Sequence, residues 1–193
     1  MCSSDLAAGL CTNPRGHIPV DAHCRTAVSH IFAVGDVIGP PSLASASMEQ
    51  GRRAMRAALG LPLADAQDGI PVGIYTIPEI ASVGLSEAEA TQKGHSCFVG
   101  RAHFRELARG QIAGCTDGML KLVTEAESGK VLGCQIVGEG ATELIHLAQL
   151  AMANGTTAEA FVESIFNFPT LAEAYRVAGL DVMAQRQRAQ AVR

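Results

Sequence analysis

The sequence predicts an α+β domain preceded by a single βα unit. An apolar run at residues 31–34 ends at Gly35-Asp36 and is followed by a helical pattern at 43–59, which makes one βα unit. Further along, the predicted strands come before the long helices, an order typical of α+β domains. Between these parts, residues 62–71 hold two prolines and several small or acidic residues, so we expect a linker there.

The predicted βα unit is built around one buried strand. Residues 31–34 are a continuous run of β-favouring side chains, typical of a strand buried on both faces in a parallel sheet. Residues 17–20 suit a short edge strand. Ser42 is a good N-cap for the helix at 43–59, and Gly60 is placed to end it.

The second part begins with strands and one short helix. Residues 73–77 form a predicted strand that Pro78 stops, and residues 98–104 form another. Between them, Ser86 and Glu89 have the spacing of a capping box, so a short helix begins there and ends at Gly94.

A hairpin and three helices complete the prediction. Strands at 119–123 and 131–137 flank the turn signal at 127–130. A helix at 141–154 places Leu144, Ile145, Leu147, Ala148 and Ala151 on one apolar face. Thr156 with Glu159 is expected to cap the next helix.

Thr170 with Glu173 is expected to cap a last helix that runs to about Gln185. We therefore divide the chain into an incomplete domain at 1–61, a linker at 62–71, a second domain at 72–185 and a flexible tail at 186–193.

Composition excludes several classes of function. The 193 residues carry a net charge of −4, with no Trp, 2 Tyr and 6 Phe, so we expect neither a phosphate-binding surface nor stacking platforms for nucleic acid. No apolar run approaches the ~20 residues of a membrane span, and residues 1–5 lack the features of a signal peptide. We expect a cytoplasmic protein without a membrane partner.

The cysteines and histidines predict no metal site. The six cysteines stand at positions 2, 11, 24, 97, 115 and 134, with no C-x-x-C pair and no zinc-like Cys/His spacing. We interpret them as reduced thiols, mostly small core residues.

Three places could carry chemistry, and each also has a purely structural interpretation. Gly138-Glu139-Gly140 lacks the third glycine of a dinucleotide fingerprint, because Glu143 stands there, which favours a tight strand-to-helix turn. Asp36 follows a predicted strand, where it either binds a ligand hydroxyl or lies in a solvated turn. Residues 168–173 have a structural interpretation as the cap of a helix, with Thr170 as the N-cap and Glu173 bonding back to it.

Several segments are similar to one flavoprotein family, the two-dinucleotide-binding-domain flavoproteins of the glutathione reductase and dihydrolipoamide dehydrogenase class. Residues 31–37 (IFAVGDV) resemble the family's second flavin motif, and residues 75–85 (YTIPEIASVGL) resemble the start of its dimerisation domain. Residues 118–143 and 168–178 continue the likeness, which covers the chain from about Gly9 to Met183.

This resemblance implies a cofactor, a set of binding residues and a partner. The cofactor is FAD, with NAD and NADP as substrates. The motif's aspartate, which contacts the FAD ribityl chain in the family, corresponds to Asp36 and follows Gly35. Leu43 and Ala44 would lie near the flavin of their own subunit. The chain would form a homodimer in which the Phe168 carbonyl faces the partner subunit's flavin.

The resemblance also implies a reaction. Disulfide-reducing members use a histidine before Pro-Thr as the proton carrier, whereas here Phe168 takes its place while Glu173 is retained. A phenyl ring accepts no proton. Residues 40–46 and 167–178 are most similar to the branch that transfers hydride between NADPH and NAD through FAD, without a redox disulfide.

Two alternatives stay open: a disulfide reductase like dihydrolipoamide dehydrogenase or glutathione reductase, and a non-catalytic dimerisation module. The family's G-x-G-x-x-G for the FAD pyrophosphate and its NAD(P) domain have no counterpart in these 193 residues. We therefore expect the C-terminal part of a longer enzyme: the last βα unit of an FAD-binding domain, followed by the dimerisation domain, without catalytic side chains of its own.

Overall fold

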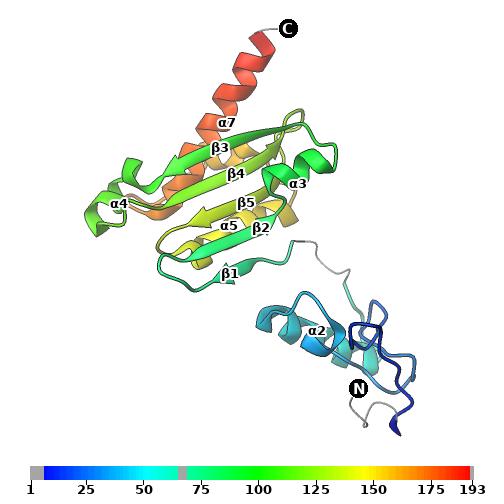
Figure 1. The fold of residues 1–193 in the computed structure, drawn as a ribbon. Coiled ribbons are helices and arrows are strands. Elements are labelled where there is room, and N and C mark those ends of the chain that lie inside the picture. The colour runs from blue at the N-terminus through cyan, green and yellow to red at the C-terminus, as the bar shows by residue number, and fades with distance from the viewer. Residues whose placement is uncertain (1–6, 65–68, 192–193) are drawn as a thin grey trace. The chain divides into compact units, whose positions relative to one another are not determined.

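The computed structural model describes residues 7–64 and 69–191. The chain divides into two compact units, Met1–Ala66 and Gln67–Arg193, which we call the N-terminal unit and the C-terminal unit (Figure 1). The division falls within the predicted linker at 62–71, of which residues 65–68 lie outside the described part.

The N-terminal unit contains little regular structure. Among its described residues, 7–64, the elements are the 3-10 helix η1 (Gly35–Ile38) and the α-helix α2 (Ala44–Ala58), and irregular segments and turns make up most of the remainder. Its main apolar cluster has three buried residues, Leu10, Ile18 and Ala33.

Both strands predicted in this unit are wrong. At 17–20 the chain is a loop whose Ile18 N–H donates to the Val37 carbonyl at 2.9 Å. The run at 31–34 makes one isolated bridge, between Phe32 and Arg25. A strand buried on both faces needs neighbouring strands along its length, and the described residues of this unit supply only that bridge.

The C-terminal unit is built on a five-stranded antiparallel sheet with the order β1-β2-β5-β4-β3 (Figure 1). The strands are β1 (Val72–Ile74), β2 (Ile80–Gly84), β3 (Cys97–His103), β4 (Met119–Glu125) and β5 (Val131–Val137). The predicted β4–β5 hairpin is confirmed, and β1 is shorter than the predicted 73–77. The sequence prediction missed β2.

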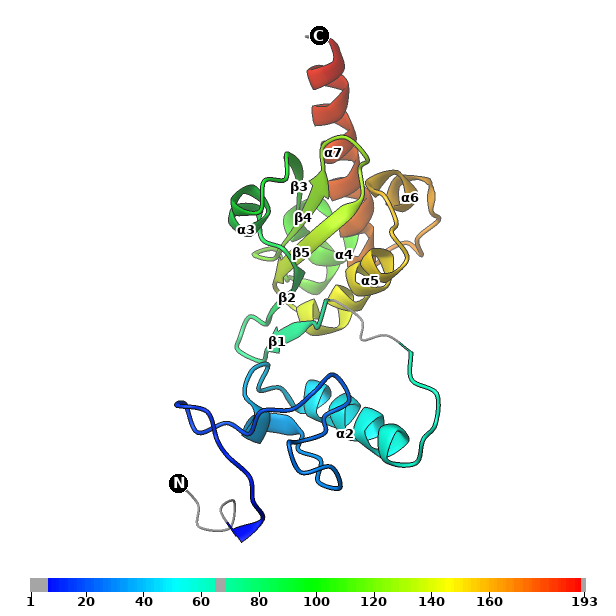
Figure 2. The ribbon, with the colours of Figure 1, turned by 90° about the vertical axis from the view of Figure 1, so that its right-hand side faces the viewer.

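Helices cover the two faces of the sheet unequally. Figure 2 shows α5 (Ala141–Ala153), α6 (Ala158–Glu163) and α7 (Ala174–Ala191) on one side and α3 (Glu87–Gln92) on the other. The 3-10 helix η2 (Phe104–Glu106) and helix α4 (Ala108–Ala113) connect β3 to β4, and η3 (Leu171–Glu173) precedes α7. The predicted α+β fold is confirmed.

The core lies mainly between the sheet and the α5–α7 layer. The largest fully buried side chains come from η2, the central strands and these helices. They include Phe104, Leu120, Leu122, Ile136, Ile145 and Tyr175. Gly100 on β3 lets α7 approach the sheet, because a Cβ there would lie 2.0 Å from the Ala178 carbonyl oxygen.

The predicted cap of α3 is confirmed and that of α6 is wrong by one residue. The Ser86 N–H donates to the Glu89 carboxylate at 2.8 Å, and the Glu89 N–H donates to the Ser86 hydroxyl at 3.3 Å. At α6 the N-cap is Thr157. Thr156 is already engaged, because its N–H donates to Ala151 at the end of α5 and its carbonyl accepts from Val131.

The predicted flexible tail at 186–193 is wrong up to residue 191. Helix α7 continues to Ala191, beyond the predicted end at Gln185. Arg186 forms an ion pair with Glu159 and donates to the Glu127 carbonyl at 2.9 Å, which ties this part of α7 to the rest of the unit. Residues 192–193 lie outside the described part. Within the described ranges, no helix is long and apolar enough to cross a membrane.

Candidate functional site

Asp36 is presented on a turn that helix α2 holds in place. It lies in η1, its side chain is exposed, and its backbone oxygen accepts a hydrogen bond from Gly39 at 3.1 Å. Gly35 before it has a φ of +76°, a conformation that favours glycine. The Gly35 N–H donates to the Gln50 side chain at 2.7 Å, so α2 fixes the backbone that carries Asp36.

Leu43 and Ala44 lie at the beginning of α2 in the same unit. The predicted N-cap Ser42 is wrong by one residue: the N-cap is Leu43, which supplies no capping side chain. The Leu43 N–H donates to the Pro41 carbonyl at 3.0 Å and its φ is −126°, so Leu43 stays extended and the helix begins at Ala44. The first amides of α2 are therefore available to an outside acceptor.

Phe168 lies in the C-terminal unit on a loop between α6 and η3. Its side chain is 74% exposed and that of Ile165 is 97% exposed. Polar contacts hold the loop: the Thr170 hydroxyl donates to the Asn167 carbonyl at 2.8 Å, and Arg176 donates to the Ser164 carbonyl. These hydrogen bonds hold the loop backbone, and the side chains of Ile165 and Phe168 are exposed to solvent.

Glu173 is engaged in capping the helix start. Its carboxylate accepts a hydrogen bond from the Thr170 N–H at 3.2 Å, as the cap at the start of the last helix predicts. The N-terminal unit contains four of the predicted binding residues, Gly35, Asp36, Leu43 and Ala44. Phe168 and Glu173 belong to the other unit.

The Gly138-Glu139-Gly140 motif forms the turn between β5 and α5, as the structural interpretation predicts. Gly138 and Gly140 have φ values of +136° and +71°. Gly140 is the N-cap of α5 and has no side chain with which to cap it. Any side-chain cap of α5 therefore comes from another part of the chain.

That capping group is Glu79, which the sequence analysis missed. Its carboxylate accepts hydrogen bonds from the Thr142 N–H at 3.0 Å and from the Thr142 hydroxyl at 2.8 Å. The backbone N–H first, and then the hydroxyl, lower the pKa of the Glu79 carboxyl below its ordinary value. The sequence held one signal for such a distant cap: helix α5 begins without a Ser, Thr, Asp or Asn at its N-cap position.

A cleft of about 380 Å³ opens next to this contact, at one end of the sheet. It is lined by the β1–β2 connection (Thr76, Ile77, Pro78, Glu79), the segment before β4 (Gly114, Cys115, Thr116, Asp117, Gly118) and the turn residues Gly138 and Glu139. None of the sequence-predicted binding residues lines it.

Two further features of the described part of the chain concern metal binding and the buried thiol of Cys134. No cluster of three or more His, Cys, Asp or Glu in it could hold a metal ion. Cys134 is buried against the Tyr175 hydroxyl, with 3.9 Å between sulfur and oxygen, and burial raises the pKa of its thiol to about 12. This thiol is a core group.

Comparison with known proteins defines the class. The family model described as "Pyridine nucleotide-disulphide oxidoreductase, dimerisation domain" matches residues 70–178, and the model described as "Pyridine nucleotide-disulphide oxidoreductase" matches residues 3–51. The chain belongs to the pyridine nucleotide-disulphide oxidoreductase family.

Within that family the chain is similar to soluble pyridine nucleotide transhydrogenases. It is 51% identical to that of Mycobacterium tuberculosis (strain ATCC 25177 / H37Ra) over 176 residues, which are 91% of this chain and 38% of the relative. It is 49% identical to that of Pectobacterium atrosepticum over 177 residues, or 90% of this chain and 38% of the relative. The chain thus spans well under half the length of these relatives.

Solved structures share the fold. LpdA from M. tuberculosis superposes with a TM-score of 0.82 at 27% identity, over 89% of this chain and 38% of that one. The flavoprotein disulfide reductase RclA from Escherichia coli gives a TM-score of 0.86 at 23% identity, over 91% of this chain and 41% of that one.

Proposed function

We propose that this chain is the C-terminal part of an FAD-dependent homodimeric oxidoreductase that transfers hydride between NADPH and NAD in the cytoplasm. The observation that carries the proposal is the 51% identity, over 91% of the chain, to proteins named soluble pyridine nucleotide transhydrogenase. The chain covers 38% of those relatives, so the activity is that of the longer enzyme.

Phe168 favours hydride transfer over disulfide reduction. A thiol–disulfide reaction needs a group that accepts and returns a proton beside the sulfur, and a phenyl ring does neither. Glu173 supports the start of its own helix through Thr170. Transfer of hydride between a flavin and a nicotinamide needs no such proton carrier.

The N-terminal unit offers groups that suit FAD. The exposed Asp36 carboxylate can accept hydrogen bonds from ribityl hydroxyls, and the uncapped amides at the start of α2, beginning with that of Ala44 next to Leu43, can donate to polar atoms of the cofactor. Gly35 sets the direction of Asp36 through its bond to Gln50. FAD, when bound, supplies the ring that accepts and releases hydride.

Exposed apolar side chains of the C-terminal unit support a homodimer. They come from α5, α7 and the loop before η3: Leu147, Leu150, Ile165, Phe168 and Leu180. Burying such side chains against a second copy removes apolar surface from water. In this proposal the Phe168 loop reaches the partner subunit's flavin and places a backbone carbonyl there.

An enzyme assay tests the proposed activity. A longer polypeptide that contains this sequence, loaded with FAD, is mixed with NADPH and an NAD analogue whose reduced form absorbs at a separate wavelength. Reduction of the analogue without any dithiol is the expected result. Efficient reduction of lipoamide or glutathione disulfide, with no reaction between the nucleotides, would overturn the proposal in favour of a disulfide reductase.

A second measurement separates the enzyme from a non-catalytic module. We expect the 193-residue chain alone to be colourless, and the longer polypeptide to hold one flavin per subunit. Substituting Asp36→Ala in the longer polypeptide should weaken flavin retention, whereas Asp21→Ala, a second surface carboxylate of the same unit, should leave it unchanged. A longer polypeptide that folds and binds no flavin would indicate a module without catalysis.

A further inference from the structure

The Phe168 loop, residues 164–170 between α6 and η3, has an anchor on each side of Phe168. After Phe168, the Thr170 N–H donates to the Glu173 carboxylate at 3.2 Å. Before it, Phe166 is half-buried and packs against the main core of the C-terminal unit. The Phe168 side chain itself is 74% exposed, so the position of the Phe168 backbone depends on these two anchors.

The anchor before Phe168 includes one side chain of α7, that of Arg176. Its guanidinium donates to the Ser164 carbonyl, and its Cζ lies 5.9 Å from the centre of the Phe166 ring, within the range of a cation–π contact. The hydrogen bond joins residues 12 apart in the chain, so it ties the loop to α7. An arginine suits both contacts, because its N–H groups lie in the guanidinium plane while the face of that plane can stack on a ring.

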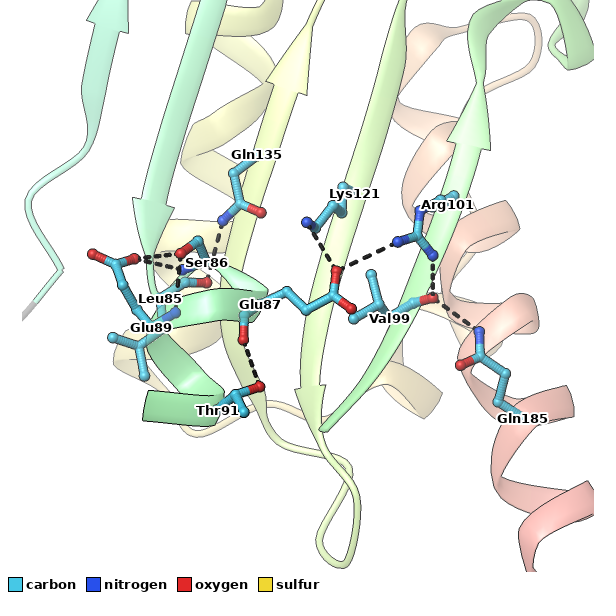
Figure 3. A network of polar contacts seen from close by, with 10 residues as sticks. All are labelled: Leu85, Ser86, Glu87, Glu89, Thr91, Val99, Arg101, Lys121, Gln135 and Gln185. Atoms are coloured by element: carbon cyan, nitrogen blue, oxygen red, sulfur yellow. Dashed lines mark hydrogen bonds and ion pairs between the residues drawn. The ribbon is translucent and has the colours of Figure 1, made fainter. Parts of the chain in front are cut away.

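The polar surroundings of Arg176 differ from those of an ordinary surface arginine. Figure 3 shows such an arginine in the same unit, Arg101 of β3, which reaches the Glu87 carboxylate at 3.4 Å. The Arg176 Nε, in contrast, is buried and has no hydrogen-bond partner among residues 7–64 and 69–191. A buried donor without a partner costs free energy, and proteins accept such costs mainly at functional sites. The contacts of Arg176 with the loop therefore suggest a role beyond stability.

We propose that Arg176 is a positioning residue for hydride transfer, because it holds the loop so that the Phe168 carbonyl lies at the partner subunit's flavin. This inference rests on the proposed function, in which the loop acts across the dimer. The carbonyl lies two residues beyond Phe166, so it moves when that anchor is released. A displacement of about 1 Å near the reacting groups can lower a rate roughly a hundredfold. Arg176 acts through the loop and is not itself a catalytic residue.

The first experiment measures the loop in the 193-residue chain, without any cofactor. Chymotrypsin cleaves after Phe166 when the loop opens locally, and mass spectrometry follows that bond. Cleavage in Arg176→Ala should be roughly tenfold faster than in the wild type. Arg176→Lys keeps a donor for the Ser164 carbonyl, should give an intermediate rate, and carries the comparison if the alanine variant folds poorly. Arg101→Ala, which breaks the ion pair in Figure 3, is the control and should match the wild type. Equal cleavage of all four proteins would overturn the proposal.

The second experiment measures hydride transfer by the longer polypeptide loaded with FAD. For Arg176→Ala we expect a rate per bound flavin roughly tenfold below that of the wild type, with the flavin content unchanged. Arg101→Ala should keep both the wild-type rate and the wild-type flavin content. A wild-type rate in an Arg176→Ala variant whose loop is cleaved faster would overturn the positioning role and leave the proposed function intact. An inactive wild-type polypeptide would overturn the proposed function, and this inference with it.

Hybrid dimers show whether Arg176 acts across the dimer. In one hybrid, an Asp36→Ala subunit, which should lack flavin, is paired with an Arg176→Ala subunit. The remaining flavin then faces an unaltered loop, and we expect the wild-type rate per flavin. In the other hybrid, one subunit carries both substitutions and its partner is wild type, so the remaining flavin faces the altered loop and the rate should fall. The opposite order of the two rates would show that Arg176 supports its own subunit alone, and would overturn the proposal.

Discussion

The two units of this chain use similar apolar sequences to opposite effect. In the C-terminal unit, the apolar run of β5 lies between β2 and β4 and contributes to a continuous core. In the N-terminal unit, the equally apolar run at 31–34 makes one bridge and buries Ala33 in a cluster of three. A strand-like sequence therefore becomes a strand only where the same chain supplies its neighbours.

This difference in core size suits the different roles that we propose for the two units. The C-terminal unit has a large core, which can keep its surface and the Phe168 loop in a fixed position. The N-terminal unit contributes a short turn with Asp36 and one helix, which suit a cofactor that other parts of a longer enzyme also contact. Three of the four predictions compare one position in each unit, and the remaining one compares a buried with an exposed tyrosine inside the C-terminal unit.

The largest effect is expected from matched leucine truncations. Leu120 is fully buried between sheet and helices, so Leu120→Ala should lower the free energy of unfolding of the C-terminal unit by about 2–5 kcal/mol. Leu10 lies in the small cluster of the other unit, and Leu10→Ala should leave that transition unchanged. Urea unfolding followed by tyrosine fluorescence reports the C-terminal unit alone, because Tyr75 and Tyr175 both lie there. An equal loss of unfolding free energy in Leu120→Ala and Leu10→Ala would contradict the difference between the two units.

Glycine substitutions should have opposite signs in the two units. At Gly100 an added Cβ would lie 2.0 Å from the Ala178 carbonyl, so Gly100→Ala should destabilise the C-terminal unit by about 1–3 kcal/mol as α7 is displaced. Gly51 lies inside α2 with open space around it, so Gly51→Ala should stabilise that helix by about 0.5–1 kcal/mol. Circular dichroism melts of both variants check the signs. A neutral Gly100→Ala would contradict the close packing of α7.

The buried hydroxyl of Tyr175 gives a smaller effect. It donates to the Leu144 carbonyl at 2.7 Å, and burial raises the pKa of this tyrosine above its ordinary value. Tyr175→Phe removes that bond and should cost about 1 kcal/mol of unfolding free energy. Tyr75 is 82% exposed, so Tyr75→Phe is the control and should stay within about 0.5 kcal/mol of wild type. A similar cost for both variants in urea unfolding would show that the core bond adds nothing.

The smallest effect is local and depends on pH. The pKa of the Glu79 carboxyl is lowered by Thr142, so its contribution is present above the ordinary value of 4.5 and is lost as the pH falls through the lower folded value. We expect the Thr142 amide resonance to shift in acid as the start of α5 loosens, and Glu79→Gln to abolish that titration. The Asp21 carboxylate, which accepts from the Arg25 and His23 N–H groups, should behave in the same way in the N-terminal unit. A Thr142 resonance unaffected by acid would contradict the capping role of Glu79.

Features that depend on neighbouring residues could be predicted from the sequence, whereas contacts between residues far apart in the chain could not. The β4–β5 hairpin, the α3 capping box and helix α5 follow from local periodicity and turn residues. The Glu79 cap joins residues 63 apart, and the Arg101–Asp181 bond joins residues 80 apart, so no local pattern contains either. The predicted strand at 31–34 was wrong because its sequence specifies the apolar side chains without specifying the neighbours.

The candidate site follows the same rule. The position of Asp36 in an exposed turn and that of Glu173 at a helix start could be predicted from sequence. The Gln50 bond that fixes Gly35, and the Arg176 contact that holds the Phe168 loop, arise from tertiary packing. The roles of Asp36, Leu43, Ala44 and Phe168 toward a flavin remain predictions that the proposed assays test.

The mass of the chain in solution tests the central claim most directly, because the proposal rests on a C-terminal unit that pairs with a second copy. Sedimentation equilibrium over a range of concentrations should give twice the 20.1 kDa of the single chain. A mass of 20.1 kDa at every concentration would contradict the account, since the Phe168 loop would then have no partner subunit to reach.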